Sequence, residues 1–235
     1  MVLLGTFINV LLIVVGSIIG RFFKNISDNM KSTVLMGIGL AVTLLGIQMG
    51  FKTSNFIIVI ISLVIGAVIG EWIDLDKKLF HLGKWMENKI GNKSSEKGIA
   101  EGFVNATLIF IIGSMGILGA LDSGIRNDHS VLITKGIIDG FTAIVLSSTL
   151  GIGVLISAIP VLFYEGIITF FAKFISEYIP EAALNLFIQE MTATGGVMIM
   201  AIGLNIAGLT KVRVANLLPG IVIVGLVVTV MFLFQ

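Results

Sequence analysis

The stretch from 131 to 174 constrains the fold of this chain more than any other. It reads VLITKGIIDGFTAIVLSSTLGIGVLISAIPVLFYEGIITFFAKF, and it is too long and too apolar for an element of a soluble core. A helix needs about 20 apolar residues to cross the hydrocarbon core of a bilayer. The stretch therefore predicts two membrane spans joined by a very short turn, a transmembrane hairpin.

Three ionisable residues interrupt this hairpin, namely Lys135, Asp139 and Glu165. A charged side chain at the centre of a bilayer costs about 3 kcal/mol or more. Such residues usually face the interior of a helix bundle, where they mark pathways for ions or protons. These three side chains are therefore the first candidates for a substrate- or ion-binding site.

Each candidate also has a purely structural explanation. Lys135 and Asp139 are four residues apart and share a helix face, so they could form a neutral pair. Lys135 could instead extend to the membrane surface and leave Asp139 alone. Glu165 has no partner four residues away; it either reaches the membrane interface or faces a wet cavity, protonated or bound to a cation. Pro160 predicts that the second helix of the hairpin is kinked or discontinuous near this residue.

The composition of the whole chain indicates an integral membrane protein. Of its 235 residues, 56% are hydrophobic and only 12% are charged, against roughly 25% charged in soluble domains. The absence of cysteine excludes disulfides, thiolate metal sites and cysteine nucleophiles. Because no hydrolase, zinc-protease or nucleotide-binding motif occurs, we expect no enzyme activity, no cofactor and no metal. A net charge of +1 gives no reason to expect a nucleic-acid partner.

Hydropathy predicts an all-α polytopic fold with about eight transmembrane helices. The first run has no basic region and no cleavage site, so we interpret it as a retained span. Residues 74–98 break the pattern: an amphipathic helix on the membrane surface is expected there, followed by the polar linker 92–97. A second surface segment is expected at 176–190. The predicted spans are 2–22, 33–50, 55–73, 99–121, the two of the hairpin 131–174, 191–209 and 214–234.

The distribution of basic residues predicts the orientation. Most of the 15 lysines and arginines fall in the loops of one side, which should be cytoplasmic. Both termini then lie outside, and the amphipathic helix of 74–98 lies on the cytoplasmic side.

The spans also resemble one another internally. GTFINVLLIVVGSIIG near the start is similar to GFVNATLIFIIGSMG from position 102, and Gly39 and Gly46 align with Gly196 and Gly203. This pattern predicts one membrane domain, 1–235, in which an inverted second repeat, 99–235, follows a first repeat, 1–73, with 131–174 inserted. Chance similarity between glycine-rich helices is the alternative.

Further polar residues lie within the predicted spans. Asn105 and Asn205 are secondary candidates for the binding site, although asparagines in spans most often join helices by hydrogen bonds. Glu101 and Glu190 are expected at span starts, near the positive end of the helix dipole. The pairs Gly16/Gly20 and Gly66/Gly70 predict faces of close helix packing.

Four segments together identify a family. GTFINVLLIVVGSIIG, EGFVNATLIFIIGSMGILGAL, the hairpin sequence and GGVMIMAIGLNIAGLTKVRVANLLPG resemble the YqgA/YdfK-like bacterial membrane proteins, domain of unknown function 554. The resemblance covers essentially the whole chain. It implies a multi-pass protein of the bacterial inner membrane and supplies no catalytic residues.

Two functional hypotheses follow. The first is a secondary transporter or channel for a small cationic solute or ion, whose site draws on Asp139, Glu165, Lys135, Asn105 and Asn205. The second is a membrane scaffold or assembly partner whose charges merely pair. The lipid bilayer is the expected partner in both, and a homo-oligomer is compatible with either.

Overall fold

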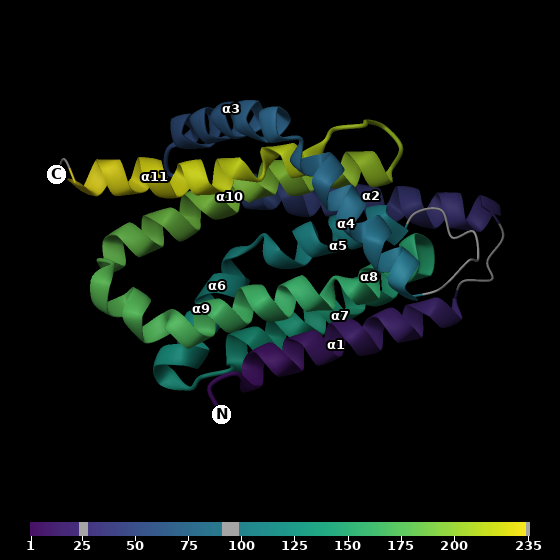
Figure 1. The fold of residues 1–235 in the computed structure, drawn as a ribbon, viewed down its shortest axis with the longest axis horizontal. Coiled ribbons are helices and arrows are strands. Elements are labelled where there is room, and N and C mark those ends of the chain that lie inside the picture. The colour runs from purple at the N-terminus through teal and green to yellow at the C-terminus, as the bar shows by residue number, and fades with distance from the viewer. Residues whose placement is uncertain (24–27, 91–98, 234–235) are drawn as a thin grey trace. The chain divides into compact units, whose positions relative to one another are not determined.

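The computed structural model describes residues 1–23, 28–90 and 99–233 (Figure 1). In this part of the chain every regular element is helical, which confirms the all-α prediction. Seven helices are long and apolar enough to cross a membrane, and an eighth span results if one bent pair is counted. The polar linker predicted at 92–97 lies outside the described residues.

The chain divides into two compact units. The first comprises residues 1–35, 79–111 and 115–174, and the second comprises 36–78, 112–114 and 175–235. The hairpin with its three ionisable residues belongs to the first unit. The predicted repeat boundaries, 1–73 and 99–235, remain a prediction.

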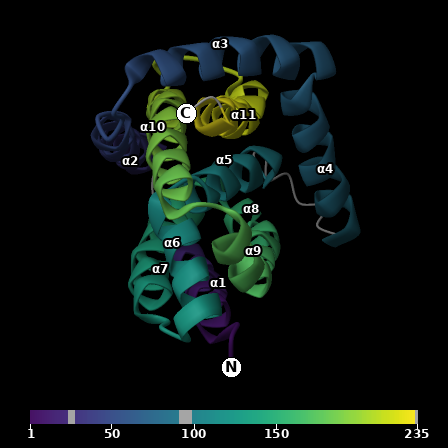
Figure 2. The same cartoon turned by 90° about the vertical axis from the view of Figure 1, so that its left-hand side faces the viewer.

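In the first unit, α1 and α7 run side by side in the same direction (Figures 1 and 2). A Cβ atom at Gly16 would overlap the carbonyl of Gly140, and one at Gly20 would overlap the carbonyl of Ile144. The glycine face predicted on the first span is therefore a face of backbone-to-backbone packing. The helices of this unit are α1 (Leu4–Phe22), α5 (Ile99–Ile111), α6 (Ser114–Arg126), α7 (Ser130–Leu150), α8 (Gly153–Ile156) and most of α9 (Ala158–Tyr178).

The second unit is likewise packed through glycine. A Cβ atom at Gly39 would lie 2.6 Å from the carbonyl oxygen of Gly203, and one at Gly46 would lie 2.6 Å from that of Gly196. These reciprocal contacts are what a twofold relation between α2 and α10 would produce. The helices are most of α2 (Asp28–Gly50), α3 (Phe56–Ile73), α10 (Glu181–Ile206), the 3₁₀ turn η1 (Val214–Leu217) and α11 (Pro219–Leu233); α4 (Leu75–Ile90) belongs partly to each unit.

One predicted span is broken. Residues 99–121 were expected to form a single helix, but α5 and α6 meet at a bend of 60° on either side of Ile112 and Gly113. The break expected near Pro160 is mild by comparison: the helix is interrupted at Ser157, and 153–178 still forms one 26-residue span. Pro160 lies in the first turn of α9, where a missing N–H group costs no helical hydrogen bond.

The segment predicted at 176–190 is not a separate element, and its placement on the membrane surface stays a prediction. Pro180 immediately precedes α10, which runs without interruption from Glu181 to Ile206. In the best membrane-spanning window of α10, 72% of the residues are buried within the protein. In the first turns of α10, by contrast, Glu181, Asn185 and Gln189 are exposed. The helix predicted within 74–98 is present as α4, and its placement on the membrane surface stays a prediction.

Candidate functional site

The three ionisable residues of the hairpin meet in one buried cluster inside the first unit. Lys135 and Asp139 come from α7, Glu165 comes from α9, and α1 adds Asn9. Relative exposures are 6% for Lys135, 7% for Asp139 and 0% for both Glu165 and Asn9. At such burial an ionised group persists only when partners compensate its lost hydration.

Lys135 lies between the two carboxylates. Its ammonium group forms an ion pair with Asp139, as the spacing of four residues predicted, and its Nζ lies 3.2 Å from Oε1 of Glu165. The Nδ2 of Asn9 donates a hydrogen bond to the same Oε1 at 2.6 Å. The expectation that nothing in the sequence neutralises Glu165 is therefore wrong, because its partners lie on two other helices, α7 and α1.

Two acceptor atoms of the cluster have no hydrogen-bond partner in the described structure: Oε2 of Glu165 and Oδ1 of Asn9, both buried. Two carboxylates face one ammonium group, so the fully ionised cluster carries one net negative charge. Uncompensated charge in a low-dielectric interior is costly. The cluster therefore has the capacity to take up one proton or one further positive charge.

Glycines on α7 allow α1 to approach this closely. A Cβ atom at Gly136 would lie 2.9 Å from the Cα of Asn9, and one at Gly140 would lie 3.1 Å from the carbonyl oxygen of Leu12. Both glycines lie on the α7 face that also carries Lys135, so the close approach brings the short Asn9 side chain to Glu165.

The half-helix α6 covers another side of the cluster. A Cβ atom at Gly116, in its first turn, would lie 3.5 Å from Cε of Lys135 and 3.6 Å from the ring of Tyr164. The break between α5 and α6 thus places a helix N-terminus beside the aliphatic stem of Lys135. Broken helices next to buried charge are common at the ion sites of membrane transporters.

Asn9 is the site residue that sequence reasoning did not select. A signal existed: Gly5, Asn9, Ile13, Gly16 and Gly20 recur every three or four residues and share one buried face of α1. A polar residue inside a glycine packing stripe must meet a partner on the helix that packs there.

The other two predicted site residues lie elsewhere. Asn105 lies half-buried on α5, outside the cluster. Asn205 lies near the end of α10 in the second unit, where its Nδ2 donates to the carbonyl oxygen of Val212 at 2.7 Å. Its Oδ1 accepts from the hydroxyl of Thr210 and the N–H of Val212. Asn205 therefore braces the loop after α10.

Glu190 was predicted at a span start. It lies inside α10 instead, and it is fully buried. Its carboxylate reaches the start of a different helix, α3. Oε1 accepts hydrogen bonds from the N–H groups of Ser54 (2.9 Å) and Asn55 (3.2 Å) and from the Ser54 hydroxyl, while Oε2 accepts one from the Thr53 hydroxyl. Glu190 does lie near the positive end of a helix dipole, but the helix is α3 and not the one that carries Glu190.

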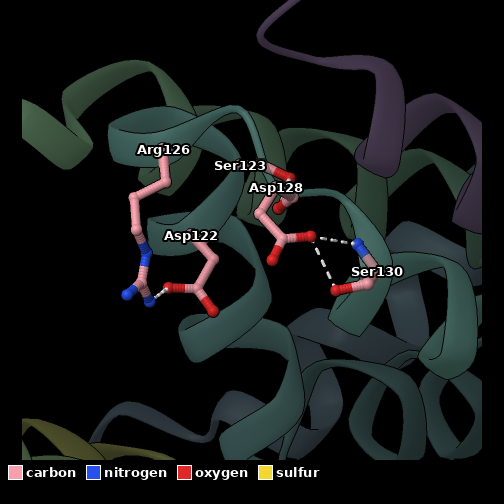
Figure 3. A network of polar contacts seen from close by, with 5 residues as sticks. All are labelled: Asp122, Ser123, Arg126, Asp128 and Ser130. Atoms are coloured by element: carbon pink, nitrogen blue, oxygen red, sulfur yellow. Dashed lines mark hydrogen bonds and ion pairs between the residues drawn. The ribbon is translucent and has the colours of Figure 1, made fainter.

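A smaller polar network fixes the turn between α6 and α7 (Figure 3). Arg126 pairs with Asp122 one helical turn earlier, and Asp128 accepts hydrogen bonds from the N–H (3.0 Å) and the hydroxyl (2.6 Å) of Ser130. These two hydrogen bonds stabilise the carboxylate and lower the pKa of Asp128. The network stabilises the start of α7, the helix that carries Lys135.

Two hollows border the first unit, with volumes of about 310 and 440 Å³. Neither is lined by Asp139 or Glu165, which lie against Lys135 and Asn9 instead. The predicted cavity lined by both carboxylates is therefore not one of these two hollows.

Comparisons with known proteins agree with the resemblance in the sequence. The model of a family described as "Protein of unknown function (DUF554)" matches residues 4–229. The "Uncharacterized membrane protein YdfK" of Bacillus subtilis is 36% identical, covering 98% of this chain and 97% of its own. The "Uncharacterized protein YqgA" of Escherichia coli is 26% identical, covering 94% of each.

No solved structure matches the chain. The family model and the relative from Bacillus subtilis both cover nearly the whole chain, and this coverage establishes its family. This multi-pass, all-helical membrane protein belongs to the DUF554 family.

Proposed function

We propose that this protein is a secondary transporter or channel for a small cationic solute or ion, with the buried cluster of Lys135, Asp139, Glu165 and Asn9 as its ion site. One observation carries the proposal: two carboxylates and one ammonium group are buried among membrane-spanning helices, with Oε2 of Glu165 unpartnered. Purely structural networks tend toward full pairing, because unbalanced buried charge lowers stability. Ion pathways need a group that can gain and lose a positive charge.

Lys135 has a specific part in this scheme. Its ammonium group occupies the position between Asp139 and Glu165 that a transported cation would also favour. A cation or proton on Glu165 weakens the attraction between Lys135 and α9, and its release restores that attraction. Because Lys135 and Asp139 belong to α7 and Glu165 to α9, binding alters the balance of forces between these helices, as coupled movement requires.

The alternative is a non-transporting scaffold or assembly partner. The feature that favours it is the same ammonium group: Lys135 contacts both carboxylates and, with Asn9, ties three helices together. In that case the charges serve only to hold α1, α7 and α9 in register. The two functions differ in whether removing one charge stops a flux or merely loosens the fold.

Reconstitution into vesicles separates these functions. Purified wild-type protein is placed in liposomes that contain a pH-sensitive dye. Gradients of Na⁺, K⁺ or an organic ammonium ion are then imposed. We expect cation-dependent dye responses that Glu165→Gln and Asp139→Asn abolish while each variant still melts cooperatively in detergent. The matched control is Glu101→Gln, which removes an exposed carboxylate from the first turn of α5.

Two results would overturn the proposal. One is a wild-type protein that is folded and inserted yet gives no response to any gradient. The other is Glu165→Gln with an undiminished response. The proposal places the protein in the bacterial inner membrane with both termini outside, following the distribution of basic residues.

A further inference from the structure

The larger of the two hollows described above borders Thr169 on α9, one helical turn from Glu165. It has a volume of about 440 Å³ and lies where α1 begins and α9 approaches its end. Thr169 contributes to its wall, and Lys173 lies one turn further along α9. The other residues that line it are Met1, Val2, Leu3, Phe7, Gly124 and Phe170.

A line of polar side chains continues inward from this wall. The hydroxyl of Thr169 lies 3.5 Å from that of Thr6, and both residues are almost fully buried. One helical turn deeper on the same two helices, Asn9 donates to Glu165. Positions 165 and 169 on α9, and 6 and 9 on α1, share a face by helical spacing. The two pairs form successive polar rungs in an otherwise apolar helix interface.

We infer that protons enter from this hollow across the Thr6–Thr169 pair and bind Glu165, so that the cation exchanged at the cluster includes the proton. The inference rests on the proposed function and names its coupling ion and its side of entry. In the step itself, a hydronium ion in the hollow loses a proton, an O–H bond forms at Oε2 of Glu165, and the net charge of the cluster changes from −1 to zero.

The chemistry of the rungs suits a proton. A threonine hydroxyl donates and accepts at once, and either hydroxyl of the pair can be the donor. The next rung lies one helical turn away, about 5.4 Å, a gap that one bridging water spans. The two hydroxyls can thus pass a proton toward Glu165 with little movement of the backbone.

A metal ion fits the same place poorly. Calcium takes six to eight oxygen ligands and magnesium six, whereas the fully buried atoms of the cluster without a hydrogen-bond partner are Oε2 of Glu165 and Oδ1 of Asn9. A proton needs only one acceptor oxygen.

The charged and titratable groups that face Glu165 are few. Lys135 and Asp139 approach it from α7, and Tyr164 is its neighbour on α9. From α1 come Asn9 and Thr6, neither of which titrates. Two variants therefore assign a protonation event to the glutamate. Glu165→Gln should remove the event, and Tyr164→Phe should leave it unchanged.

Infrared difference spectroscopy on the membrane-reconstituted protein tests the inference. A downward pH jump should produce a carboxylic-acid band that Glu165→Gln eliminates. We expect Thr169→Val, which removes the hydroxyl at nearly constant shape, to slow the appearance of the band about tenfold or more. Thr169→Ser, which retains the hydroxyl, should restore the wild-type rate.

The absence of cysteine allows a second, independent measurement. Lys173→Cys, an exposed position in the wall of the hollow, should react with a charged, membrane-impermeant thiol reagent from one side of the vesicle only. The control is Ile167→Cys, six residues earlier on α9, where the wild-type side chain is 56% exposed on the outer surface of the helix. A lipid-facing thiol at this position should react far more slowly.

The outcomes distinguish the inference from the proposed function. Equal band kinetics in Thr169→Val and wild type, or equal thiol reactivity at 173 and 167, overturn the entry route even if cation flux is present. A hydroxyl-dependent band with no flux in vesicles retains the route and removes the transporter. A band that survives Glu165→Gln overturns the inference, and so does a band that is lost in a Thr169→Ser protein that still melts cooperatively.

Discussion

Among the residues that the structure describes, each unit buries one glutamate completely, and the partners of the two differ in kind. Glu190 in the second unit accepts hydrogen bonds from two backbone N–H groups and two hydroxyls at the start of α3. Glu165 in the first unit depends on the ammonium group of Lys135 and the amide of Asn9, and one of its oxygens remains unpartnered.

The difference separates a structural carboxylate from a chemical one. The donors to Glu190 include backbone groups, so that carboxylate cannot change its interactions without disturbing the start of α3. The partners of Glu165 are side chains, and one of them is already shared with Asp139. Burial alone therefore does not identify a functional carboxylate; the nature of its partners does.

The largest effect is expected from Lys135→Met, which keeps the length of the side chain and removes its charge. Two buried carboxylates would then face each other without compensation, which should cost about 3 to 5 kcal/mol. Thermal melting in detergent measures the loss. The triple variant Lys135→Met, Asp139→Asn, Glu165→Gln should recover most of it, because no net charge remains. If Lys135→Met alone melts like wild type, the lysine does not balance the cluster.

A smaller loss is expected from Glu190→Gln. One oxygen becomes an NH₂ group, which faces donors instead of acceptors, and the destabilisation should be about 3 kcal/mol. Vesicle flux per folded molecule should remain unchanged, in contrast to Glu165→Gln. The control is Asp128→Asn, which alters a carboxylate with the same kinds of donor in an exposed turn and should scarcely change melting. Flux lost in Glu190→Gln would erase the distinction between the two glutamates.

The smallest loss of stability is expected from a glycine substitution in the second unit, which tests whether close backbone packing stabilises that unit too. Gly39→Ala would place a Cβ atom 2.6 Å from the carbonyl oxygen of Gly203, and the overpacking should cost about 2 kcal/mol. Gly37→Ala, two residues earlier on α2, meets no atom within 4 Å and should be neutral or slightly stabilising. Equal melting temperatures for the two variants would show that α2 does not pack on α10 as described.

Sequence patterns predicted the spans well where hydropathy and helix length decide. The glycine pairs on the first and third spans were also predicted as packing faces: Gly66 meets the backbone of Gly220, and Gly70 meets that of Asn216. The patterns missed that α10 begins at Glu181 and continues through residues 181–190. They missed it because polar residues such as Asn185 and Gln189 are exposed on this helix and lower the hydropathy of its first turns.

The sequence by itself determined that this protein is an all-helical membrane protein with three ionisable residues in one hairpin. Those properties are local, since hydropathy, spacing and composition act along the chain. Only the tertiary structure decided that Asn9 and Lys135 are partners of Glu165, that Glu190 binds the turn before α3, and that the span from 99 breaks at Ile112 and Gly113. These depend on which helices meet, because a buried polar group must find its partners in space and is indifferent to their distance in sequence.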